Sequence, residues 1–241
     1  MSELFSIQLQ NQQQSRDGVW LDLPTTTEQV QAALRQIGIS SDNPQGLFIS
    51  GYFAEEEKRF AISYNMVLAS NVDELNFLAS RLETLSTGER AELNAALQAP
   101  QSELFSIGRI TDFPENVDYY VHLPDVHGPA QLGDYYLNRS GMVNMPEEWK
   151  GGIDTAQFGR YVAQQEQGVF TEYGYLVKSG DEWQKVHEGQ PVPEEYRVLS
   201  FPAPEVLRDS ANIPPPVQPE TEPQKVIPII LNGKDLSLIH I

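Results

Sequence analysis

The sequence predicts an α+β protein built from small, separately organised parts. Short stretches that alternate apolar and polar residues, as half-buried strands do, occur toward both ends of the first 201 residues. Between them, apolar residues recur at helical spacing after recognisable capping residues. We therefore expect an elongated chain, with a small three-stranded sheet plus a helix, a central domain of short helices, and a second α+β domain with antiparallel strands.

The expected first domain, residues 1–69, combines three strands with one helix. Its strands are predicted, from alternation or short apolar runs, at residues 4–9, 19–23 and 47–53. In the second of these strands, alternation places Trp20 and Asp22 on the face opposite the apolar residues.

A helix is predicted between the second and third strands. Thr25 and Glu28 have the spacing of a capping box, in which each side chain bonds the other residue's backbone N–H. Gly38 marks the expected end of the helix. The apolar stripe between these points is expected to pack on the sheet: Val30, Ala33, Leu34 and Ile37.

The expected central domain, residues 70–116, consists of two short helices. Asn71 with Glu74, and Ser86 with Glu89, repeat the capping-box spacing. Leucines at helical spacing follow each box, so both helices are expected to bury one face.

The expected third domain, residues 117–201, mixes helices with strands. Helices are predicted over residues 131–138 and after Asp154, which has the position of an N-cap. The last two strands are expected to form a hairpin through Gly180. Strands are predicted at residues 119–123, 169–171, 174–178 and 182–187.

The composition changes after residue 201. Closely spaced prolines over residues 202–224 predict a semi-rigid, extended linker. Residues 225–241 are expected to be a truncated or artefactual tail. Its strand-like piece, residues 225–231, has no expected partner, and the last six residues look like a translated sequencing adapter.

Acidic residues outnumber basic ones along the whole chain. There are 34 Asp and Glu against 16 Lys and Arg, which gives a formal net charge of −18. Such a surface repels nucleic acid and attracts basic clefts, so no nucleic-acid partner is expected. Solubility alone is the alternative explanation for the acidic surplus.

Sequence signals of catalysis, secretion and membrane insertion are lacking. The absence of cysteine excludes disulfides and thiolate chemistry. There is no P-loop, nucleophile elbow or dinucleotide fingerprint, so neither catalysis nor a cofactor is expected. Without a signal peptide or an apolar stretch of membrane-spanning length, the chain is expected to be cytoplasmic, with no membrane partner.

One cluster has the residue types of a metal site. His122, Asp125 and His127 offer nitrogen and carboxylate ligands suited to zinc or iron. Pro124 and the intervening turn leave their geometry open, so exposed loop residues are the default interpretation and a metal hydrolase is an alternative. We expect no metal at this position.

Four segments occur in an order that is informative as a set. They are residues 18–30, 71–79, 153–160 and 193–198. Together they resemble the successive domains of the ArdA family of antirestriction proteins. Each motif alone is a capped helix or a turn, so the ordered set is much more specific than any member. One departure is the third strand, where the family's acidic residues are displaced here to Glu55, Glu56 and Glu57.

The resemblance implies a non-enzymatic inhibitor. ArdA proteins are elongated homodimers that imitate bent duplex DNA, occupy the DNA-binding groove of type I restriction–modification enzymes, and protect an incoming plasmid or other mobile genetic element. The implied partners are therefore a type I restriction–modification enzyme and a second copy of the chain. The alternative is a non-inhibitory adaptor module of a mobile element, tethered to a further C-terminal domain.

The carboxylates of such a mimic would act by position, in place of phosphates opposite Lys and Arg of the enzyme. Binding is expected to be spread over many of them, and solvated or capping roles are the alternative for each one. The candidates lie where acid is densest: Asp73, Glu74, Glu83, Glu89, Glu92, Glu103, Asp112, Glu115, Asp118, Asp125, Asp134, Glu147 and Glu148.

Aromatic residues at core-like periodic positions form a separate group. We interpret them as packing residues, with a minority at a dimer interface. They are Trp20, Tyr119, Tyr135, Phe158, Tyr161 and Trp183.

Overall fold

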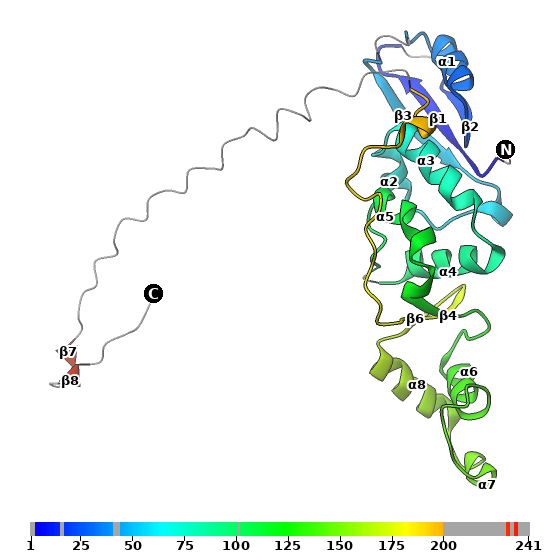
Figure 1. Ribbon diagram of the computed structural model, residues 1–241, viewed down its shortest axis with the longest axis vertical. Helices are drawn as coiled ribbons and strands as arrows, with labels where there is room; N and C mark the ends of the chain where they lie inside the picture. The colour runs from blue at the N-terminus through cyan, green and yellow to red at the C-terminus, as the bar shows by residue number, and fades with distance from the viewer. Residues whose placement is uncertain are drawn as a thin grey trace. The chain divides into compact units, whose positions relative to one another are not determined.

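The computed structural model describes residues 3–14, 17–40, 44–100 and 102–199, together with two short backbone segments near the C-terminus. Contacts divide the chain into two units, residues 1–201 and 202–241 (Figure 1). The first unit holds two three-stranded antiparallel sheets and several short helices, so the predicted α+β class is confirmed. Within the described part of the chain, no helix has both the length and the apolar character needed to cross a bilayer.

The first sheet has the strand order β2-β1-β3. Its strands are β1 (Phe5–Asn11), β2 (Val19–Leu23) and β3 (Leu47–Phe53), close to the predicted bounds. Ile7, Leu9 and Leu23 are fully buried on one face. A register shift between Gln8 and Leu9 places one extra residue in β3.

Helix α1 (Thr27–Gln36) covers the buried face of this sheet and begins one residue later than predicted. Its capping box joins Thr26 to Gln29, so the prediction of Thr25 and Glu28 was wrong. Thr25 is buried, and its backbone N–H donates to Asn76 Oδ1 at 2.7 Å. Thr25 was predicted as the cap from local spacing alone. Its position is instead set by the contact with Asn76 on a distant helix.

The two predicted helices form, as α3 (Val72–Glu83) and α4 (Thr87–Gln98). Two further short helices, α2 (Tyr64–Leu68) and α5 (Ile107–Thr111), were not predicted. Both predicted capping boxes are present, Asn71 with Glu74 and Ser86 with Glu89. Short 3₁₀ turns flank these helices: η1 (Glu56–Lys58), η2 (Phe113–Glu115) and η3 (Val117–Tyr119). One hydrophobic core joins α3 and α4 to the first sheet.

The second sheet has the strand order β4-β6-β5. The strands are β4 (Tyr120–Leu123), β5 (Val169–Thr171) and β6 (Gly174–Lys178). The neighbouring helices are α6 (Pro129–Asp134), which continues into the π-helical turn η4 (Tyr135–Arg139), α7 (Glu147–Lys150) and α8 (Thr155–Glu166). As predicted, the Asp154 side chain caps α8. A second buried cluster forms here around Val126, Leu132 and Tyr175.

The strand predicted over residues 182–187 does not form. Backbone N–H groups of this segment donate to side chains and not to a neighbouring strand. The N–H of Gln184 donates to Asn116, and the N–H of Val186 donates to Asp112. The hairpin predicted through Gly180 is therefore wrong, and β6 pairs with β5 and β4. The irregular chain that follows β6 continues to the 3₁₀ turn η5 (Glu194–Tyr196).

In the second unit, β7 (Ile230–Leu231) pairs antiparallel with β8 (Lys234–Asp235). The expectation that residues 225–231 would have no partner was therefore wrong for their C-terminal end. The predicted proline-rich linker, residues 202–224, and the adapter-like ending lie outside the described residues.

Candidate functional site

Many cationic side chains of the described residues lie in ion pairs with carboxylates. The pairs are Lys58–Glu55, Arg81–Glu115, Arg109–Glu103, Arg109–Glu188, Arg139–Asp134, Lys150–Glu147, Lys178–Glu103 and Lys185–Glu188. These pairs neutralise basic residues locally and leave the surplus acid on the surface. Exposed carboxylates include five of the predicted candidates: Glu115, Asp118, Asp125, Glu147 and Glu148.

Three predicted candidates accept hydrogen bonds from the backbone, two of them as helix caps. Glu74 and Glu89 complete the boxes that begin α3 and α4. Hydrogen bonds from the side chain and backbone of Ser86 lower the pKa of the Glu89 carboxyl. Asp73 Oδ1 accepts the backbone N–H groups of Val198 and Leu199 at 2.7 and 2.9 Å. Each of these carboxylates therefore has a structural role.

Asp112 is fully buried, so it cannot belong to an exposed mimic surface as predicted. Its two carboxylate oxygens accept the backbone N–H groups of Val186, His187 and Glu188 at 3.2, 2.6 and 3.2 Å. A buried carboxylate is stable when such donors surround it. Asp112 thus fixes the irregular segment that the sequence had predicted to be a strand.

Glu92 lies half-buried on α4, and its Oε1 has no hydrogen-bond partner. Burial raises the pKa of this carboxyl to about 8, and the negative charges of Glu89 and Asp118 add to the effect. The side chain is therefore largely protonated at neutral pH. Glu92 was predicted as a negatively charged group of the mimic surface, but in this state it contributes little negative charge.

The remaining candidates are paired or partly covered. Glu115 pairs with Arg81, and the exposed Glu147 pairs with Lys150 at 2.9 Å. Glu83 is half-buried at the end of α3. Hydrogen bonds from Asn138 and then Arg139 lower the pKa of Asp134.

Glu103 is the most heavily paired of the candidates. It bonds Arg109 at 2.9 Å and Lys178 at 2.7 Å. The hydrogen bond from Lys178 is the largest effect that lowers its pKa. Both cations would have to move before this carboxylate could meet a partner's Lys or Arg.

The structure does not bring His122, Asp125 and His127 together as metal ligands. His122 Nε2 lies 2.7 Å from the backbone oxygen of Tyr173, while Asp125 and His127 are exposed. Within the described residues, the group whose ligand atoms lie within 4.8 Å of one another is Asp112, Glu115 and His187.

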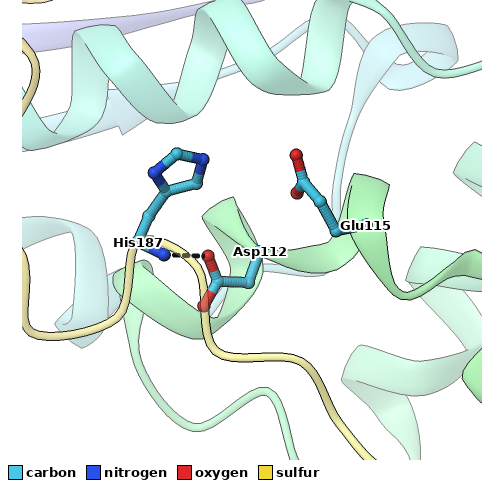
Figure 2. A group of neighbouring side chains, drawn as sticks. All are labelled: Asp112, Glu115 and His187. Atoms are coloured by element: carbon cyan, nitrogen blue, oxygen red, sulfur yellow. Dashed lines mark hydrogen bonds between the residues drawn. The ribbon is translucent and has the colours of Figure 1, made fainter.

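The geometry of that second group suits structure better than metal binding. Figure 2 shows the backbone nitrogen of His187 facing the Asp112 carboxylate, while the imidazole points away from it. The imidazole packs edge-on against Phe77, with ring centroids 4.9 Å apart. Because Glu115 already pairs with the cation of Arg81, a metal ion bound to this carboxylate would lie close to that positive charge and be repelled by it.

The aromatic residues divide into packed and exposed groups. Tyr119 and Trp183 pack edge to face with ring centroids 5.1 Å apart and contact the core, as predicted. Trp20 and Tyr161 are 50% and 60% exposed, so they do not pack in the core of one chain, and only the dimer-interface part of the prediction is left for them. For Trp20 the signal was present in the sequence, since alternation placed it opposite the apolar face of β2.

Exposed acids outside the predicted set also occur. Glu55, Glu56 and Glu57 begin the turn that follows β3, and Glu194 and Glu195 begin η5. Adjacent acids at a turn were the sequence signal for both groups. They extend the exposed negative charge beyond the central and third domains.

Comparison with known proteins identifies a matching protein family. A family model described as "Antirestriction protein (ArdA)" matches residues 13–177, from the turn after β1 almost to the end of β6. No curated protein gives a significant match. The matched region covers more than half of the chain.

Proposed function

The chain belongs to the ArdA family of antirestriction proteins, and we propose that it inhibits type I restriction–modification enzymes as an acidic mimic of duplex DNA. The charge balance supports this proposal. The net charge is −18, and many Lys and Arg side chains of the described residues lie in ion pairs. The unneutralised carboxylates are available to the Lys and Arg side chains of a DNA-binding groove.

The proposal reduces the predicted candidates to the groups that solvent reaches. The exposed candidates are Glu115, Asp118, Asp125, Glu147 and Glu148. Glu147 and Asp134 lie in ion pairs at the surface, and such pairs contribute little stability, so a partner's cation can replace the internal one at small cost. The buried and capping carboxylates support this surface from within.

A homodimer completes the proposed mimic. DNA carries about two phosphate charges per base pair, so a chain of charge −18 matches about 9 base pairs and two chains match about 18. The longer length is closer to the footprint that an enzyme groove covers. The proposed action is stoichiometric, without catalysis or cofactor, in the cytoplasm where a restriction enzyme meets incoming DNA.

The test is inhibition of a purified type I restriction enzyme by the full chain, with competing DNA over a series of salt concentrations. We expect inhibition that competes with DNA and weakens as salt rises, because exposed charge pairs are screened. Polyglutamate of equal total charge is the control for bulk charge, and light scattering after size exclusion measures the dimer. A folded dimer that inhibits none of several type I enzymes would favour the adaptor function instead.

A further inference from the structure

The outer face of the first sheet carries three exposed side chains, those of Trp20, Asp22 and Phe53, beside the half-buried Ser6 and Gln8. In the strand register, Ser6 of β1 lies between Asp22 of β2 and Phe53 of β3. The next row on this face is Trp20, Gln8 and Gly51. Helix α1 packs against β2 and buries apolar side chains with the other face of the sheet. We call Trp20, Asp22, Gly51 and Phe53 the Trp20 face.

Gly51 allows the Trp20 indole to lie across the sheet. A Cβ added at Gly51 would come within 3.0 Å of Trp20 Cη2 and of Gln8 Cβ. The indole therefore reaches over the central strand to the position that a side chain at residue 51 would occupy. It meets the Phe53 ring edge to face, with centroids 6.5 Å apart. Both rings remain at least half exposed, at 50% and 58%.

Carboxylates lie next to these rings. Asp22 is on the same face, two residues from Trp20, and accepts a hydrogen bond from Ser6 Oγ at 2.6 Å. Exposed Glu55 and Glu56 follow two and three residues after Phe53. A hollow of about 220 Å³ lies between β2 and α1, with Trp20 and Asp22 on the strand side and Gln29, Ala32 and Gln36 on the helix side. It therefore adjoins the edge of the Trp20 face and does not lie on it.

We propose that the Trp20 face receives an arginine or lysine side chain from the basic DNA-binding surface of the restriction enzyme. The flat indole offers a cation–π contact, and the Asp22 carboxylate offers a charge-assisted hydrogen bond to the same cation. An aromatic ring beside a carboxylate suits the side chain of arginine or lysine, which has both a charge and an apolar part. A surface of carboxylates alone would attract any cation equally. The enzyme as partner rests on the proposed function, whereas the cation preference rests on this geometry.

Other occupants fit the charge less well. A nucleobase could stack on the indole, but its phosphates would meet Asp22 and a chain of charge −18. A second copy of this chain would place the same net negative charge beside Asp22, so we expect the proposed homodimer to form through another surface. Charge complementarity therefore favours a cationic protein segment.

A first experiment tests the cation preference without the enzyme. An oligoarginine peptide is titrated into the ¹⁵N-labelled full chain, and the indole N–H signals of Trp20, Trp149 and Trp183 are followed by NMR. We expect the Trp20 signal to shift first, with weaker binding in Gly51→Val, which keeps the indole but displaces it. No shift, an equal shift of the 68% exposed Trp149, or a shift induced by single-stranded DNA would each overturn the proposal.

A second experiment measures the affinity of full-chain variants for a purified type I enzyme. Trp20→Ala is expected to bind roughly three- to thirtyfold more weakly, with an unchanged salt dependence, because a cation–π contact is lost and no charge is removed. Asp22→Asn should weaken binding and reduce the salt dependence, while Trp149→Ala should bind like wild type. Equal affinity of Trp20→Ala and wild type would overturn the proposal.

The two experiments separate the two ideas. If the peptide shifts Trp20 but the wild-type chain neither binds nor inhibits the enzyme, the proposed function fails and the cation-binding face stands. If the chain inhibits the enzyme, but the peptide does not shift the Trp20 signal and Trp20→Ala binds the enzyme like wild type, the face fails and the proposed function stands. Circular dichroism confirms that each variant is folded.

Discussion

The carboxylate of Asp73 accepts the backbone N–H of Val198 at 2.7 Å, across 125 residues of sequence. The same oxygen accepts the N–H of Leu199 at 2.9 Å. The first turn of α3 therefore holds the end of the first structural unit. A residue that the sequence offered as a surface charge is a long-range connection in the fold.

Asp73→Ala should destabilise the protein by about 1.5–3 kcal/mol, because two N–H groups lose a charged acceptor. Urea unfolding measures the loss, and hydrogen exchange should quicken at Val198 and Leu199 in particular. Glu148→Ala, an exposed change, is the control and should lie within about 0.5 kcal/mol of wild type. Unchanged stability and exchange in Asp73→Ala would contradict the assignment.

Asp112→Asn should cost about 2 kcal/mol or more, because an amide presents one acceptor oxygen to three N–H donors and leaves at least one unsatisfied. Exposed Asp118→Asn is the matched control. Adding Zn²⁺ to the wild type should leave the unfolding midpoint unchanged, since Arg81 already pairs with Glu115. A rise in that midpoint with zinc, abolished by Asp112→Asn, would identify a metal site instead.

Gly159→Ala should destabilise the crossing of α6 and α8. A Cβ there would lie 1.8 Å from the Pro129 carbonyl oxygen, and one at Gly133 would lie 1.9 Å from that of Thr155. Neither backbone can yield easily, so we expect a loss of about 3 kcal/mol in the free energy of unfolding. Gly88→Ala is the control of opposite sign: its Cβ meets nothing within 4 Å on α4, and it should stabilise by up to about 1 kcal/mol.

Elements set by local interactions were predictable from the sequence, and those set by distant partners were not. The boxes of α3 and α4 form within four residues of chain, and both were predicted. The cap of α1 shifted by one residue because Asn76 bonds the backbone of Thr25. Residues 182–187 alternate like a strand, but Asp112 and Asn116 take their N–H groups.

The candidate carboxylates and Trp20 also divide into features set locally, which the sequence predicts, and features set by distant contacts, which it does not. Acid density in the sequence located the charge but could not separate the buried Asp112 from the exposed Asp118, because burial depends on packing between distant segments. Alternation correctly oriented Trp20 away from the core side of β2. The position of the Trp20 indole over Gly51 depends on the register of β1 with β2 and β3. The sequence pattern of one strand does not encode that register.

Glu92 should make stability fall as the pH rises between about 4.5 and about 8. Its folded-state pKa is raised to about 8 from an ordinary value near 4.5, so the folded protein binds more protons than the unfolded chain across this window. Glu92→Gln should therefore flatten the pH dependence and be relatively more stable at the alkaline end. Urea unfolding at several pH values measures this, with Glu148→Gln as the exposed control. Parallel pH profiles for Glu92→Gln and wild type would contradict the shift.

Removing single exposed charges should have little effect on inhibition, whereas removing several should weaken it strongly. Asp118→Asn, Asp125→Asn and Glu148→Gln should each change the inhibition constant by less than about fivefold, because an exposed ion pair contributes about 0–1 kcal/mol. The triple variant should bind more weakly and with a shallower salt dependence, since fewer screened charge pairs form. Inhibition of the type I enzyme over a salt series measures both quantities. One substitution that abolishes inhibition would show a single essential contact, and a triple variant identical to wild type would place the mimic surface elsewhere.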